Sequence, residues 1–143
     1  MAAEVTPKLT QAPRSTLPRV RFISLFVPNL AEATSRYASL LQMAPSEATG
    51  GAPSPHPFAT KGPVVFQLGD LALALYECDG HTTHAGDVGL GLESNVEQTA
   101  VRLRQQGGTV FWGPATNSGS ETGLAIGMMP ERHFFEIVEP PGD

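Results

Sequence analysis

The alternation of apolar and polar positions predicts that the first structured part of the chain is a strand followed by a helix. Residues 20–27 (V-R-F-I-S-L-F-V) are rich in β-branched and aromatic side chains, which is typical of a strand. Strand geometry places three of these side chains together on one face: Phe22, Ser24 and Phe26. Asn29 then stands at an N-cap position with Glu32 three residues later, so a helix is expected to begin there.

Residues 44–63 interrupt this regular pattern. They contain five prolines and three glycines, which makes a regular central strand a poor expectation. We therefore predict a long loop here, or a lid over a site. Regular strand patterning returns at residues 63–68 and 71–77, which predict a hairpin around Gly69-Asp70.

The same order of elements then begins again. Residues 87–92 predict a strand, and residues 95–106 predict a helix that ends at Gly107-Gly108. Three further strands are expected, over residues 109–112, 122–129 and 133–138. The chain is therefore a β-α-β-β(-β) unit written twice, and two such units sharing one core predict a single α+β domain.

The length of 143 residues also fits one domain. Residues 1–18 are rich in proline, threonine and alanine without strand or helix periodicity, so we expect an arm outside the core. The domain is predicted to span residues 19–143, with module one over 19–80 and module two over 84–140.

Composition narrows the class of partner. Hydrophobic residues make up 41% of the chain, enough for a packed interior, and the formal net charge is −5. An acidic protein lacks the basic face that a nucleic-acid backbone or an anionic membrane requires. Cys78 is the single cysteine, and the first residues do not form a signal peptide, so we expect a cytoplasmic protein without a disulfide.

The order of these motifs resembles one protein family. A strand, an N-L-x-x-A helix start, G-G-T-V at residues 107–110 and a late P-E-x-x-x-x-E-I-V strand at residues 130–138 are similar to the vicinal oxygen chelate superfamily. That superfamily includes glyoxalase, bleomycin-resistance and extradiol-dioxygenase proteins. The resemblance covers about residues 20–140 and implies two βαβββ modules, each curved into a half-open cup, and a homodimer.

The resemblance also implies where a metal would be held. Metal-dependent members take His, Gln or Glu ligands from the first and last strand of each module. Carried over to this chain, those positions fall on Phe22 and Ala74 in module one, and on Asp87 and Glu136 in module two. Because Phe and Ala cannot bind a cation, the chain resembles the metal-free, bleomycin-resistance-like branch, and we expect no metal and no other cofactor.

The turn before the last strand departs from the superfamily pattern as well. The pattern there is D-P-x-G, whereas this chain has M-P-E-R at residues 129–132. The missing Asp and Gly leave the geometry of this turn open, although the strand after it is still expected.

Cys78, His81 and His84 form a C-x-x-H-x-x-H spacing between the two modules. One interpretation is a metal clip, or a histidine that reaches into a cup. The other is a polar linker with solvated imidazoles, which is favoured because zinc sites usually need a second pair of ligands.

Large rings facing small residues predict a pocket on the cup side of the sheet. The candidate ligand-binding residues are Phe22, Ser24, Phe26, Tyr76, Trp112 and Glu136. In this hypothesis the rings stack on a ligand, Ser24 orients it, and Glu136 pairs with a cationic or hydrogen-bond-donating group. The alternative is that the rings fill the cup as ordinary core.

The sequence supports three functional interpretations. The first is a small-molecule-binding protein that takes an aromatic or cationic metabolite or drug without metal. The second is a glyoxalase-like lyase, isomerase or transferase that uses Glu136 as a base or a metal ligand. The third is an interaction module whose exposed apolar cup binds another protein. The sequence does not decide whether the protein is an enzyme.

Overall fold

The structure is a computed structural model that describes residues 17–113 and 123–140. Most of the predicted arm, residues 1–16, lies outside the described residues, as does the first residue of the strand predicted at 122–129. Within the described part, neither helix is long and apolar enough to cross a membrane.

Module one forms two strands after its helix instead of three. Its elements are β1 (Arg19–Val27), α2 (Leu30–Leu41), β2 (Ala59–Leu68) and β3 (Leu71–Cys78). Between α2 and β2, the described chain makes only an isolated bridge from Ser46 to Val65. The prolines between α2 and β2 explain this, because proline has no N–H to donate to a neighbouring strand. The loop predicted over residues 44–63 is wrong at its end, since β2 already begins at Ala59.

Module two forms the complete pattern. Its elements are β4 (Val88–Glu93), α3 (Val96–Gln105), β5 (Thr109–Trp112), β6 (Leu124–Met128) and β7 (Phe134–Val138). Both helices begin as predicted. Asn29 accepts the backbone N–H of Glu32, and Asn95 accepts that of Gln98, each at 2.9 Å.

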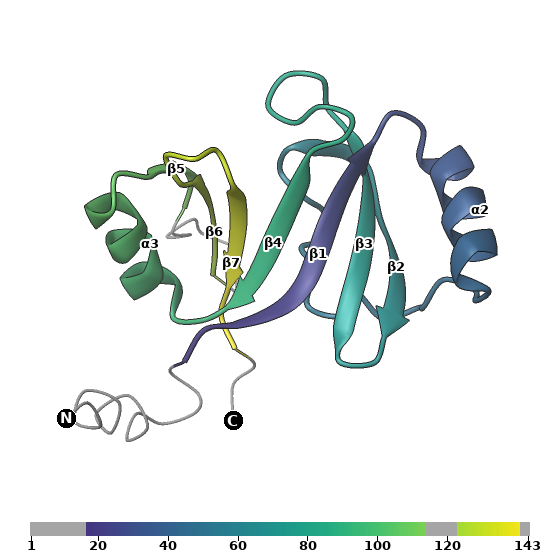
Figure 1. The fold of residues 1–143 in the computed structure, drawn as a ribbon, viewed down its shortest axis with the longest axis horizontal. Coiled ribbons are helices and arrows are strands. Elements are labelled where there is room, and N and C mark those ends of the chain that lie inside the picture. The colour runs from purple at the N-terminus through teal and green to yellow at the C-terminus, as the bar shows by residue number, and fades with distance from the viewer. Residues whose placement is uncertain (1–16, 114–122, 141–143) are drawn as a thin grey trace.

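One sheet joins the two modules, with the strand order β2-β3-β1-β4-β7-β6-β5 (Figure 1). β1 pairs with β4 in antiparallel fashion, while β1–β3 and β4–β7 are parallel pairs. The first strands of the two modules therefore lie side by side at the centre of a curved, open sheet. This architecture confirms the predicted α+β class.

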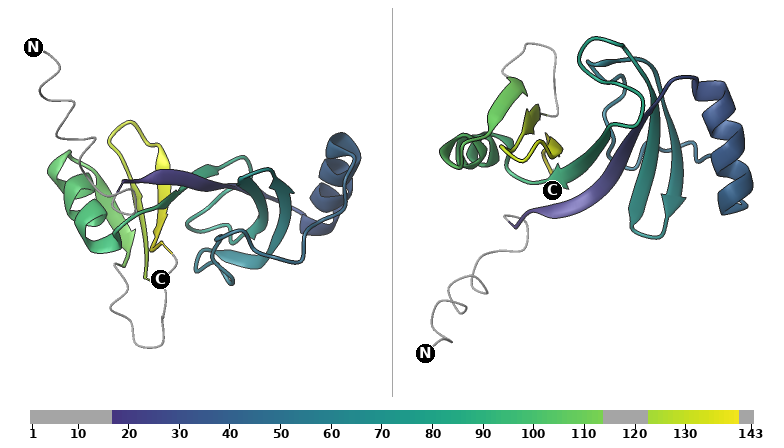
Figure 2. Two further views of the ribbon diagram at one scale, coloured as in Figure 1. Left: turned by 90° about the horizontal axis from the view of Figure 1, so that it is seen from below. Right: turned by 45° about the horizontal axis from the view of Figure 1, so that its top comes forward.

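The two faces of the sheet are covered differently. Both helices lie on the outer face, where α2 packs on β1, β2 and β3, and α3 packs on β4, β6 and β7. The opposite, inner face is the cup, and the segment between α2 and β2 covers it (Figure 2). The cup is therefore where aromatic side chains from both modules meet.

Candidate functional site

Glu136 lies on the cup face of β7 and is 0% exposed. The hydroxyl of Ser24, on β1, donates a hydrogen bond to its Oε1. Its Oε2 contacts Nε2 of His56, which comes from the segment between α2 and β2. A carboxylate inside an apolar cup needs such partners, because an unpaired buried charge is strongly destabilising.

The hydrogen bonds of His56 fix where its proton lies. The backbone N–H of Phe58 donates to Nδ1 at 3.0 Å, so Nδ1 is an acceptor. In a neutral imidazole the proton is then on Nε2, which donates it to Glu136. Glu136 thus accepts hydrogen bonds from both Ser24 and His56, an arrangement suited to an ionised carboxylate.

Aromatic rings surround the imidazole of His56. Its centroid lies 5.2 Å from that of Phe26, 4.8 Å from that of Tyr76 and 5.8 Å from that of Phe58. The Tyr76 hydroxyl donates to the carbonyl of Pro53 at 2.6 Å. Burial raises the pKa of Tyr76 above its usual range, and the nearby negative Glu136 raises it further. Tyr76 therefore acts as a hydrogen-bond donor and ring contact, not as a base.

Two glycines of β4 make room for these side chains. A Cβ on Gly89 would lie 2.7 Å from the ring of Phe134 and 3.3 Å from the carboxyl carbon of Glu136. A Cβ on Gly91 would lie 2.4 Å from three ring atoms of Phe22. The space that these glycines leave is therefore occupied by Phe22, Phe134 and Glu136.

The structure brings together five of the six residues predicted for the pocket. The buried set on the cup face is Phe22, Ser24, Phe26, Tyr76 and Glu136. Trp112 lies apart at the end of β5, is 38% exposed, and touches the cup through Phe58, with ring centroids 6.0 Å apart. In this structure the cup is filled by the protein's own side chains, His56 among them.

Sequence reasoning missed His56, which is central to the site. Two signals pointed to it separately. One was the expectation that Glu136 pairs with a cationic or hydrogen-bond-donating group, and the other was the expectation that residues 44–63 form a long loop or a lid. His56 is the histidine within those residues, so combining the two expectations would have identified it.

The positions carried over for a metal centre lie on different rows of the sheet, since Phe22 is in register with Gly91 and Gly91 is in register with Glu136. Along the β1–β3 pair, Ser24 and not Phe22 lies opposite Ala74, and Gly89 lies opposite Ser24 on β4. Asp87 precedes β4, where its carboxylate accepts the backbone N–H of His84 at 2.9 Å. The residues in register with Glu136 on the strands beside β7 are Gly91 on β4 and Ile126 on β6, and Ser24 on β1 reaches its carboxylate with a hydroxyl.

This donor set does not fit a chelated metal ion. His56 adds an imidazole, but its Nε2 is hydrogen-bonded to Glu136 and its Nδ1 to a backbone N–H. In residues 17–113 and 123–140, no group of three His, Cys, Asp or Glu side chains could hold a metal ion. We therefore derive no chemistry through a metal at this site.

The linker between the modules is a polar turn organised by Asp79. Its Oδ1 accepts the backbone N–H groups of His81, Thr82 and Thr83, at 2.8–3.1 Å. Partial burial raises the pKa of Asp79, but these backbone donors outweigh it and lower the pKa overall. His81 and His84 are exposed, in agreement with a solvated linker.

Comparison with known proteins gives matches at the level of structure alone. No protein-family model matches the chain, and no curated protein matches its sequence. A glyoxalase/bleomycin resistance protein/dioxygenase superfamily member from Vibrio splendidus 12B01 matches with a TM-score of 0.54 and 11% identity, over 87% of this chain and 100% of that one. Methylmalonyl-CoA epimerase from Mycobacterium tuberculosis matches with a TM-score of 0.55 and 12% identity, over 94% and 96%. A protein described as an NAD-dependent benzaldehyde dehydrogenase from Legionella pneumophila matches with a TM-score of 0.56 and 17% identity, over 84% and 98%.

The chain has the glyoxalase/bleomycin resistance protein/dioxygenase fold. The predicted resemblance to the vicinal oxygen chelate superfamily is thereby confirmed at the level of fold. Because identity is low in every case, the likeness carries no activity over to this chain, and function has to be argued from the cup itself.

Proposed function

We propose that the protein binds a small molecule with a flat ring that carries an N–H or a positive charge, and that this ring takes the place of His56 against Glu136. The observation that carries this proposal is the imidazole itself. A flat N–H donor already lies among Phe26, Tyr76 and Phe58 with its proton directed at Glu136. The cup is therefore complementary to a ligand of this kind, and no metal is needed.

The energetics of the cup support a functional reason for Glu136. A buried ionic or strongly polar cluster is commonly no more stable than an apolar core of the same volume. Purely structural packing would be satisfied by a leucine or methionine at this position of β7.

Besides the hydrogen bond from His56 to Glu136, few hydrogen bonds among the described residues attach the segment between α2 and β2 to the sheet. Ser46 N–H donates to the carbonyl of Val65 at 2.6 Å, and the Tyr76 hydroxyl donates to the carbonyl of Pro53. Thr83 adds a hydrogen bond to the carbonyl of Phe58 at 2.8 Å. Segments with few such contacts open at lower free energy than the strands of a core, so a ligand has a route into the cup.

Titration of the wild-type protein with benzimidazole tests this proposal. Benzimidazole has a flat ring and an N–H donor, whereas benzofuran has a similar shape without the N–H. We expect calorimetric binding of benzimidazole that is stronger in His56→Ala, because the internal competitor is gone. Glu136→Gln, which keeps the shape of the side chain, should weaken binding about tenfold to a hundredfold.

Two outcomes contradict the proposal. If His56→Ala binds benzimidazole but the wild-type protein binds neither benzimidazole nor other flat N–H or cationic rings, His56 is a permanent part of the core. If benzofuran binds as well as benzimidazole, the carboxylate does not select the ligand.

A catalytic role for Glu136 is the second candidate. The specific observation in its favour is that the carboxylate is held between two donors, Ser24 and His56, in a site from which water is excluded. Displacing His56 would free one carboxylate oxygen to accept a proton from a bound substrate. Exchange of a ligand's C–H hydrogen with solvent deuterium, present in wild type and lost in Glu136→Gln, would identify this activity.

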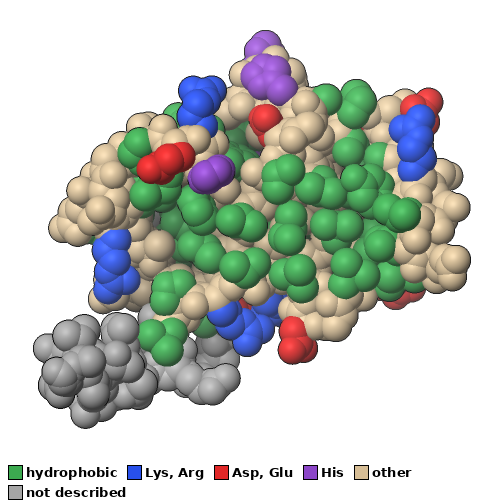
Figure 3. Space-filling model, viewed as in Figure 1, with side chains coloured by type: hydrophobic (Ala, Val, Ile, Leu, Met, Phe, Trp, Pro, Cys, Tyr) green, Lys and Arg blue, Asp and Glu red, His purple; other side chains and the backbone are tan. Residues whose placement is uncertain are grey.

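We also propose that two copies of the chain associate through the outer face of the sheet. Leu73, Ile23 and Leu90 lie in register on the neighbouring strands β3, β1 and β4, and all three are half-buried. Figure 3 shows hydrophobic side chains gathered on this face. An apolar patch of this kind commonly marks a protein interface.

A further inference from the structure

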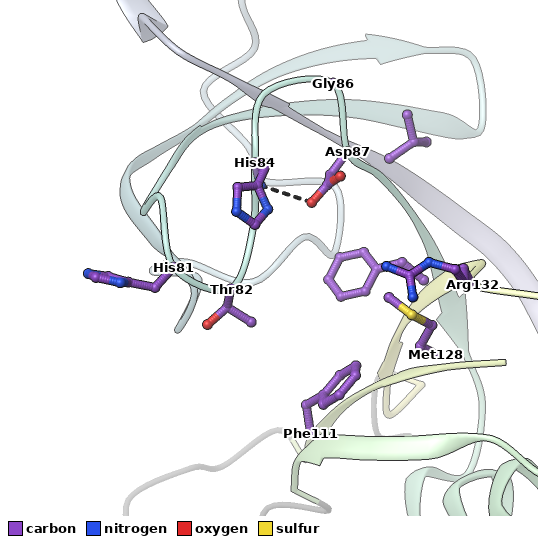
Figure 4. Close-up of a pocket in the computed structure, with 10 residues that line it drawn as sticks. His81, Thr82, His84, Gly86, Asp87, Phe111, Met128 and Arg132 are labelled. Atoms are coloured by element: carbon purple, nitrogen blue, oxygen red, sulfur yellow. Dashed lines mark hydrogen bonds between the residues drawn. The ribbon is translucent and has the colours of Figure 1, made fainter. Parts of the chain in front are cut away.

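A recess lies at one end of the cup, between the two modules. Its volume is about 600 Å³. The loop between β3 and β4 forms one wall, and β5, β6 and the β6–β7 turn form the other (Figure 4). Charged, polar and apolar side chains line it together, among them His84, Asp87, Phe111, Met128, Arg132 and Phe134.

Arg132 adopts a backbone conformation that an arginine does not favour. Its φ is +78°, in the left-handed region where glycine is normally found. Two backbone hydrogen bonds hold the turn, from Arg132 N–H to the carbonyl of Met129 at 2.8 Å and from Met129 N–H to the carbonyl of His133 at 3.0 Å. The turn thus keeps a shape that suits glycine, although the residue is arginine. Strained residues of this kind concentrate at functional positions.

The side chain of Arg132 lines the recess. Figure 4 shows its guanidinium directed into the open space, opposite His84. It makes no ion pair with any residue of the described ranges 17–113 and 123–140. Asp87 is the acidic residue of the lining, and its Oδ2 accepts the backbone N–H of His84. A guanidinium directed into a hollow is well suited to receive a planar anion.

Apolar side chains lie next to this positive charge. Phe111 is 46% exposed on β5, and Met128 and Phe134 complete the apolar wall. An exposed phenyl ring in a concave site offers a flat surface for another ring. The recess therefore combines one cationic donor with an aromatic wall.

We propose that this recess binds a small organic anion with a flat apolar body. Its anionic group, a carboxylate or a phosphate, is held by Arg132, and its body lies against Phe111 and Phe134. This site adjoins the cup at Phe134 but does not include Glu136, and it selects the opposite charge, so it does not depend on the role proposed for Glu136. The arginine is retained in place of glycine because its guanidinium holds the ligand.

The test uses 2-naphthoate, 2-naphthyl phosphate and the neutral 2-naphthol, each titrated into the full chain and followed by calorimetry. We expect at least one of the two anions to bind, and 2-naphthol to bind at least tenfold more weakly. The stronger of the two anions identifies which anionic group the site takes. Arg132→Gln should reduce anion binding at least tenfold.

Arg132→Gly separates this role from a structural one. Glycine accepts the positive φ, so this variant should melt at the same temperature as wild type or higher, yet lose anion binding as fully as Arg132→Gln. Gln42→Gly is the matched control, because Gln42 is the other described non-glycine residue with positive φ, at +56°. It should keep its stability and bind the anion as wild type does.

Three results would overturn the proposal. They are binding of neither anion to the wild-type chain, anion binding that survives both Arg132 substitutions, and equal binding of 2-naphthol. A lower melting temperature of Arg132→Gly would show instead that the arginine supports the turn. It would overturn the claim that arginine stands in place of glycine in order to hold the ligand.

Discussion

His56 and Glu136 depend on each other for burial. The imidazole gives Glu136 the second of its two donors, and Glu136 gives the imidazole an acceptor in a region otherwise formed by rings. Removing either partner leaves the other polar group buried with fewer hydrogen bonds. At the scale of single residues, this pair is therefore the most sensitive point of the cup.

Replacing His56 by alanine should destabilise the protein by about 2–4 kcal/mol, since it leaves a cavity and removes a donor from a buried carboxylate. Chemical denaturation measures this loss. Adding free imidazole should restore part of the stability, because it refills the same space and donates to Glu136.

The control is His133→Ala, which removes an exposed imidazole three residues before Glu136. We expect its stability to stay within about 0.5 kcal/mol of wild type and not to respond to imidazole. Equal stability of the two alanine variants would show that the His56 ring does not contribute to the cup.

Strand alternation was sufficient to place most of the candidate site. It put Ser24 and the rings of Phe22 and Phe26 on one face, and Glu136 among apolar neighbours, because a period of two holds along any regular strand. It did not reach His56, which lies in a proline-rich segment without a period. It also did not give the register between strands, which places Phe22 on one row with Gly91 and Glu136, and Ala74 on another with Ser24 and Gly89.

The start of α2 shows how an element is fixed by a distant strand. Besides the Asn29 cap, the carboxylate of Glu77 on β3 accepts the backbone N–H of Leu30 at 2.9 Å. This hydrogen bond lowers the pKa of Glu77 below its ordinary value of 4.5, and Lys61 and Thr60 lower it further against a smaller opposing effect of burial. A negative charge at this end of the helix also matches the helix dipole.

Glu77→Gln should therefore lower the melting temperature near neutral pH. In the folded protein the pKa of Glu77 lies below its ordinary value of 4.5. The stabilisation that the Glu77 charge gives to the fold is therefore fully present above pH 4.5, and it is lost as the pH falls through the folded-state pKa. The difference in melting temperature between wild type and Glu77→Gln should thus become smaller as the pH falls. Thermal melts from pH 7 to pH 3 measure it.

Glu47→Gln provides the comparison, since Glu47 is an exposed carboxylate in the loop after α2. Its melting temperature should follow that of wild type across the range. A pH-independent gap for Glu77→Gln would contradict the role of the charge and indicate a loss of packing instead.

Elements with a strong local signal were predicted closely. Both helices start at the expected asparagines, and every strand with β-branched or aromatic alternation is present. The strand that module one lacks falls between α2 and β2, where prolines remove the donors that a ladder requires. How that segment folds over the cup depends on contacts far apart in the chain, which local patterns do not encode.

At the scale of the whole molecule, the close pairing of β1 with β4 unites the modules. Gly91→Ala would place a methyl group 2.4 Å from the ring of Phe22, which is buried and cannot move aside. We expect a loss of about 1–3 kcal/mol from overpacking, in a single unfolding transition. Calorimetry measures both the loss of stability and whether the protein unfolds in a single transition.

Gly123→Ala is the control for Gly91→Ala, because among the described residues a Cβ there meets no atom nearer than 3.4 Å. It should leave stability within about 0.5 kcal/mol of wild type. Two separate transitions in Gly91→Ala would show that each module folds on its own.

The proposed dimer is tested by a charge on the outer face. Leu90→Lys should shift the protein toward monomer in sedimentation velocity at tens of micromolar, because a lysine opposes burial of the patch formed by Leu73, Ile23 and Leu90. Leu40→Lys, at a position on α2 that is 74% exposed, should leave the association unchanged. A wild-type chain that is monomeric at all concentrations would contradict the dimer.

His56 gives the cup a distinctive kinetic behaviour if a ligand must replace it. The imidazole is tethered to the site, so it competes at a fixed effective concentration that dilution does not change. Ligand can enter only during the fraction of time that the segment is open. The apparent affinity is therefore the intrinsic affinity multiplied by that fraction. The observed rate of binding should then level off as ligand is added, at the rate with which the segment opens, and that ceiling should be the same for chemically different ligands.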